Sequence, residues 1–272
     1  MGEAAAAIPV PAPRADLWTV AAIAVVAYAA DDMIHEVLGH GLACALTGVR
    51  PLALSSVALQ TGTESRLVAA AGSIMNVVAG LLSLWLFHRS RRFGAMRYFL
   101  WLSASTNLLN GTGYLFFSGL LGIGDWSVVI AGLKPHALWR GLLALAGAAL
   151  YVGVVRLSAR TMASLVRAGD VDRRDVGRLV FPAYVAGGLL LVAASALNRI
   201  DPSLVLTSGV SSGFGAMAGL AMVPRLVEAG TGGAGAGGAA ARPLSFNAAW
   251  TAAAAFIALV FIAVLGPGVK LS

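Results

Sequence analysis

The chain has 272 residues, of which 58% are hydrophobic and only 11% are charged. Soluble domains carry about a quarter charged residues, so this composition, with a mean hydropathy of +0.83, predicts an integral membrane protein. The net charge of +7 does not indicate nucleic-acid binding, because the arginines cluster in short segments between apolar runs, as in membrane-flanking loops. The single cysteine, Cys44, excludes an intrachain disulfide and a four-cysteine metal site.

Residues 1–16 precede the first apolar stretch. Glu3 comes before any basic residue, and prolines occupy the positions where a signal peptide has its apolar core. The segment is therefore expected to be a short disordered lead.

Seven stretches approach the roughly 20 apolar residues that a spanning helix needs. They predict an all-α fold, a polytopic transmembrane helix bundle with about six to seven spanning helices. A Gly/Ala-rich segment, residues 228–245, predicts a flexible linker before the last helix. The expected spans are about 17–46, 67–87, 98–121, 138–157, 179–197, 206–223 and 246–265.

The basic residues are distributed unequally between the connections. Of the 19 lysines and arginines, 13 fall in the N-terminus and in segments 88–97, 156–178 and 224–245. The positive-inside rule then places the N-terminus in the cytoplasm. The Ala-, Gly- and Arg-rich composition suggests a bacterial cytoplasmic membrane. We expect a core at 17–126, further transmembrane helices at 127–227 with a cytoplasmic loop at 158–178, and a C-terminal helix within 246–272.

The first apolar stretch contains DDMIHEVLGH, which is rich in ionisable side chains. Such side chains are costly in a bilayer, so they usually face the bundle interior and mark function. Two histidines with carboxylates on one helix face suit zinc, with iron or manganese also compatible. A hydrogen-bonded network between helices is the alternative. The face is formed by Asp32, Glu36 and His40 at a spacing of four, with Asp31 and His35 beside them.

The sequence IHEVLGHGLACALTGVR resembles the first zinc motif of the site-2 protease family of intramembrane zinc metalloproteases. The resemblance implies that His35 and His40 bind zinc and that Glu36 activates a water molecule. The family usually has His-Glu-x-x-His, whereas here the histidines are five residues apart. On a regular α-helix they would point about 140° from each other. A π-bulge, eased by Gly39, would bring them to one side; without it, Glu36 and His40 are the aligned pair.

The same family takes a third zinc ligand, an aspartate, from a later helix. Asp125 is the candidate, since it is the only carboxylate between Glu64 and Asp170. The order Gly-Asp here differs from the family's Asp-Gly, and a helix-end carboxylate without a metal is the alternative interpretation.

Further polar residues are expected to support the site or to bind substrate. Asn76, four residues after Gly72, resembles an element of the family's second core helix, where an amide can stabilise an oxyanion. Hydrogen bonding between helices is the alternative for it and for the other residues. These others are Asp31 and Asp32, which would orient a ligand histidine, and Asn107 and Asn110 on a polar face of the third helix.

Together these features predict an intramembrane zinc metallopeptidase with one Zn²⁺ per chain. It would hydrolyse peptide bonds of a transmembrane or membrane-proximal protein or peptide by means of a metal-activated water. Its partners would be the lipid bilayer and this substrate, with no nucleic acid, and the oligomeric state is left open. Two alternatives are a transporter or proton/metal pathway that uses the stripe of Asp32, Glu36 and His40, and an inactive protease-like scaffold. Residues 127–272 contain no recognised motif.

Overall fold

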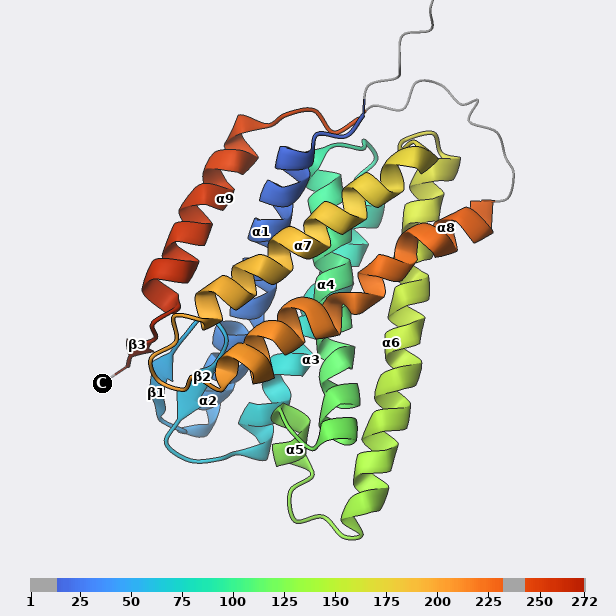
Figure 1. Ribbon diagram of the computed structural model, residues 1–272. Helices are drawn as coiled ribbons and strands as arrows, with labels where there is room; N and C mark the ends of the chain where they lie inside the picture. The colour runs from blue at the N-terminus through green and yellow to red at the C-terminus, as the bar shows by residue number, and fades with distance from the viewer. Residues whose placement is uncertain (1–13, 232–242, 272) are drawn as a thin grey trace, which may run out of the picture.

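The computed structural model describes residues 14–231 and 243–271, which form a helix bundle with one small sheet (Figure 1). The predicted fold class is confirmed. Residues 1–13 of the predicted N-terminal lead and residues 232–242 of the predicted linker lie outside the described residues. Within the described residues, six helical segments are long and apolar enough to cross a membrane, so the chain is a membrane protein. They are Leu17–Thr47, Arg66–Arg89, His136–Arg167, Arg173–Ser195, Val205–Thr231 and Ala248–Leu265.

Short polar residues begin several of these helices by accepting a backbone hydrogen bond, as helix N-caps do. Asp16 accepts from the N–H of Thr19, and Ser65 caps the second long helix. The elements of the first half are α1 (Leu17–Met33), η1 (Ile34–Gly41), α2 (Leu42–Thr47), α3 (Arg66–Arg89), α4 (Ala95–Leu121) and α5 (Asp125–Val129). Those of the second half are α6 (His136–Arg167), η2 (Arg173–Asp175), α7 (Val176–Ser195), η3 (Val205–Gly215), η4 (Ala216–Met222), α8 (Val223–Thr231), α9 (Ala248–Val260) and η5 (Phe261–Leu265).

Helix α4 is the central helix of the bundle and packs against α1, α3 and α6. Its residues 101–113 are all buried, including Ser103, Thr106, Asn107 and Asn110. It corresponds to the third predicted span, but its polar side chains make it less apolar than the six segments above. Large apolar side chains instead cover the outer faces of the bundle, for example Leu145, which is 72% exposed. That distribution suits a bundle surrounded by lipid.

Two connections are more helical than predicted. Helix α6 runs to Arg167, so the first ten residues of the expected loop 158–178 continue the helix. Helix α8 runs to Thr231, so the first four residues of the expected linker 228–245 are helical as well.

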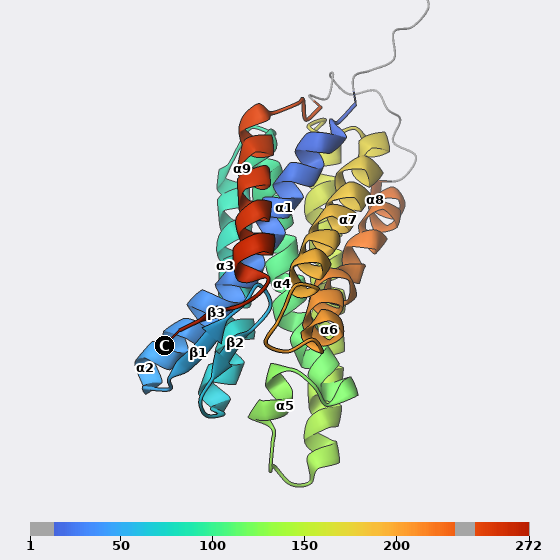
Figure 2. The same cartoon turned by 60° about the vertical axis from the view of Figure 1, so that its left-hand side comes forward.

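A three-stranded antiparallel sheet lies beside α2, at the end of the bundle opposite the start of α1 (Figure 2). Strand β1 (Pro51–Leu54) is central, flanked by β2 (Leu59–Thr61) and by the C-terminal β3 (Val269–Lys270). The sequence did not predict this sheet. Its importance for the site is that it fixes the loop between α2 and α3 next to η1.

Candidate metal centre

Segment η1, Ile34–Gly41, is a π-helix that interrupts the first spanning segment. In a π-helix the backbone hydrogen bond runs from residue i to i+5, so side chains five positions apart come onto one side. The rings of His35 and His40 are accordingly 4.7 Å apart between centroids, with an angle of 85° between their planes. The five-residue spacing, which would separate the two histidines on an α-helix, brings them together here.

Two glycines permit the close contact between η1 and α3. A Cβ on Gly39 would lie 2.5 Å from the Cα of Gly72. A Cβ on Gly72 would lie 2.5 Å from Nε2 of His35 and 2.7 Å from Cε1 of His40. Gly72 therefore leaves the space that both imidazole rings occupy.

Asp125, the first residue of α5, lies close to both histidines although it comes 85 or more positions later in the chain. Its Oδ2 is 2.9 Å from Nε2 of His35 and 3.6 Å from Nε2 of His40. The chain reaches this position through Gly122 and Gly124, whose φ angles of +71° and +78° favour glycine. The predicted third ligand thus lies beside the other two.

In each histidine, Nδ1, the ring nitrogen that does not face Asp125, donates a hydrogen bond to an acceptor. Nδ1–H of His35 donates to Oδ1 of Asn76 at 2.6 Å, and Nδ1–H of His40 donates to the carbonyl of Val68 at 2.7 Å. In a neutral imidazole this leaves the Nε2 lone pair free. Both Nε2 atoms face the Asp125 carboxylate, an arrangement that a metal ion among the three groups would stabilise and that a proton on the His35 Nε2 would also satisfy by a hydrogen bond.

The donor set fits a zinc ion. Zinc–ligand bonds of about 2.0–2.1 Å in tetrahedral geometry separate neighbouring ligand atoms by about 3.4 Å. The distances of 2.9 Å and 3.6 Å from Asp125 to the two histidines lie on either side of this value. Hydrogen bonds from Nδ1 to an amide or backbone carbonyl are the usual way in which proteins orient metal-binding histidines.

Glu36 lies beside the two histidines and is almost fully buried. One ligand atom from each of His35, Glu36 and His40 lies within 4.8 Å of the others. The Oε2 atom of Glu36 accepts a hydrogen bond from the backbone N–H of Leu59 in strand β2 at 2.6 Å. The sheet therefore positions a carboxylate at the rim of the candidate metal position.

Asn76 connects His35 to a polar network behind it. Its amide nitrogen donates to Oδ1 of Asp31 at 2.7 Å and to Oδ1 of Asn107 at 3.1 Å. Asn110 donates to the other Asp31 oxygen at 3.3 Å. With these contacts the Asn76 amide is fully engaged, so its geometry suits orienting His35 rather than binding an oxyanion.

The structure does not bring every predicted residue to the same place. Asp32 is buried, but within the described residues its side chain makes no hydrogen bond, and its Oδ2 is unpartnered. It therefore does not orient either histidine by a hydrogen bond; Asp31, through Asn76, is the aspartate connected to His35.

Two contributions to the site, both from the backbone, had no signal in the sequence. The N–H of Leu59 and the carbonyl of Val68 belong to the backbone, which residue types do not reveal. The ring of Tyr114 stacks on His35, with centroids 4.6 Å apart. Tyr114 shares a helix face with Asn107 and Asn110, and this spacing was the only available indication of its place near the site.

Comparison of the chain with protein-family models, with curated proteins and with solved structures gives no match. The functional argument consequently depends on the geometry of the centre itself.

Proposed function

We propose that this membrane protein is a zinc metallopeptidase that cleaves membrane-embedded or membrane-proximal peptide segments. The observation that supports it most is the π-helix, which turns the His35 and His40 side chains toward Asp125. These three residues would hold the ion, leaving a fourth position for water or substrate, as catalytic zinc sites do.

Glu36 is the general base in this proposal. A zinc ion held at the site supplies a Lewis acid that polarises a peptide carbonyl and makes water acidic enough to react near neutral pH. The Glu36 carboxylate takes the proton from the attacking water and transfers it to the leaving amide nitrogen. The Leu59 N–H fixes one carboxylate oxygen, which orients the group for this transfer.

The substrate class follows from the position of the site. His35, Glu36 and His40 lie within the Leu17–Thr47 membrane segment and are buried. A peptide bond inside a helix is hydrogen-bonded and shielded, so the substrate segment must unwind locally to be hydrolysed. With the N-terminus in the cytoplasm, as the arginine distribution predicts, the site lies toward the outer end of the bundle.

The test is metal content together with hydrolysis by the purified full-length protein in detergent or nanodiscs. We expect about one zinc per chain in the wild type, none in His40→Ala, and full zinc with no cleavage of single-span peptide substrates in Glu36→Gln. A well-folded, zinc-supplemented wild type without bound zinc would overturn the proposal. So would a Glu36→Gln protein that cleaves at the wild-type rate.

A further inference from the structure

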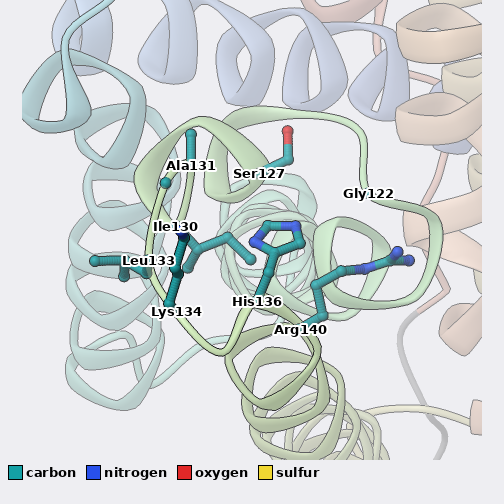
Figure 3. A pocket seen from close by; sticks show the side chains of 9 residues that line it. Gly122, Ser127, Ile130, Ala131, Leu133, Lys134, His136 and Arg140 are labelled. Carbon is teal, nitrogen blue, oxygen red and sulfur yellow. The ribbon is translucent and has the colours of Figure 1, made fainter.

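A second candidate site lies at the same end of the bundle, in the loop that connects α4 to α6. A pocket of about 470 Å³ is formed there by nine residues (Figure 3). Three of them are basic, namely Lys134, His136 and Arg140, and none is acidic. The pocket is separate from the metal centre, because none of the three proposed zinc ligands lines it.

Arg140 is fixed in place within this pocket. Its Nε donates to the carbonyl of Gly119 at 3.0 Å and its Nη2 to the carbonyl of Leu120 at 2.6 Å, both at the end of α4. Within the described part of the chain, Nη1 has no partner. An incoming anion would therefore meet a guanidinium whose orientation is already set, which lowers the entropic cost of binding.

Lys134 and His136 are exposed, and neither side chain forms a hydrogen bond or ion pair with residues 14–231 or 243–271. His136 is also the first residue of α6, where backbone N–H groups and the helix dipole favour an anion. Figure 3 shows the His136 ring between the loop and the Arg140 side chain. The side chains of Lys134 and His136, the fixed arginine and the start of α6 thus surround one cavity.

The location of the pocket favours a lipid headgroup as the source of the anion. Helix α6 has 32 residues, a length of about 48 Å, whereas the hydrocarbon core is about 30 Å thick. The helix therefore projects beyond the hydrocarbon core, and the basic Lys134 and Arg140 at its start favour the headgroup level for its first turn. Just beyond the pocket, Leu138, Leu142 and Leu145 are 54%, 48% and 72% exposed along α6, which gives acyl chains an apolar surface. Trp139 is the kind of interfacial aromatic that anchors helices at this depth.

We propose that this pocket binds the phosphate of an anionic phospholipid headgroup. The loop that forms its wall also carries Asp125, and Arg66 of α3 donates to the carbonyl of Ala131 in the same loop. A bound lipid would thus contact the segment that positions the third proposed zinc ligand. The binding itself does not depend on the proposed peptidase activity.

The experiment is a native mass-spectrometry titration of the full chain in detergent with phosphatidylglycerol, and in a separate arm with glycerol 3-phosphate. We expect one phosphatidylglycerol bound more tightly than phosphatidylcholine. Since a lysine near an anionic headgroup contributes on the order of 1 kcal/mol, the Lys134→Ala/His136→Ala double variant should bind it at least about fivefold more weakly. Lys134→Arg should retain binding.

Lys270→Ala is the matched control, because it removes one exposed positive charge from strand β3, which does not line the pocket. Thermal unfolding of each variant checks that the fold is intact. The proposed site would be overturned if Lys270→Ala weakened phosphatidylglycerol binding as much as the double variant does. It would also be overturned if phosphatidylcholine bound as tightly as phosphatidylglycerol. Glycerol 3-phosphate binding as tight as phosphatidylglycerol binding would replace the lipid by a soluble phosphate ester and overturn the lipid assignment.

Discussion

His35 and His40 are five residues apart in the chain, yet the Nε2 atoms of both rings lie within 3.6 Å of the same Asp125 oxygen. A π-helical turn makes this possible, because it places residue i+5 where an α-helix places residue i+4. The variant spacing is therefore compatible with the ligand arrangement that a shorter motif gives on an α-helix.

Gly72→Ala tests whether the space beside the two rings is needed. The new Cβ would lie 2.5 Å from His35 Nε2, a distance that forces either the ring or α3 to move. We expect loss of most bound zinc, measured by metal analysis of the purified protein. Gly153→Ala is the control, because nothing lies within 4 Å of the added Cβ in α6. It should keep its zinc and raise stability by up to about 1 kcal/mol.

Asn76→Ala tests the orientation of His35. The variant removes the acceptor of the His35 Nδ1–H and leaves the Asp31 carboxylate with one partner fewer. Loss of such a supporting contact typically weakens metal binding 10–100-fold, which a competition titration with a zinc chelator would measure. Ser83→Ala, on the same helix and with its side chain hydrogen-bonded to Ser103, should leave the affinity unchanged. Similar weakening in both variants would mean that the effect comes from helix packing.

The sequence predicted the parts of this protein that depend on composition and short-range spacing. The spanning helices follow from apolar runs, and the polar stripe containing Glu36 follows from a spacing of four. The histidine spacing left a π-bulge as one of two alternatives, and the sheet was not predicted at all, because tertiary packing decides both. Gly39 fits against Gly72 only once α3 is in place, and strand β3 has two residues that pair with a segment more than 200 positions earlier.

Helix α4 gives a second example of a feature that depends on tertiary packing. Asn107 and Asn110 were placed on one face of a helix by their spacing, but their partners were not evident. Their contacts, Asn76 and Asp31, come from two other helices. Sequence spacing gives the face of a helix, and the tertiary fold decides what that face contacts.

Leu59→Pro tests the backbone bond to Glu36. Proline removes the N–H that Oε2 of Glu36 accepts at 2.6 Å, and hydrogen bonds to a charged group are worth about 1.5–3 kcal/mol. If Glu36 is the general base, we expect kcat to fall by about 10-fold or more while the zinc content stays unchanged. Leu59→Ala retains the N–H and should be close to wild type. Loss of zinc in the proline variant would instead indicate that Glu36 is a metal ligand.

Deletion of Leu38 tests the π-helix itself. Leu38 is 51% exposed and lies between Glu36 and His40, and a π-bulge accommodates one residue more than an α-helical turn does. Removing it should convert η1 to α-helix, with His35 and His40 four residues apart, and leave α1 and α2 in phase. We therefore expect zinc to be retained. Insertion of one alanine after Leu38 should abolish zinc binding, because no single regular turn aligns residues six apart. Loss of zinc in the deletion together with retention in the insertion would show that the histidines do not act as a pair on one helix face.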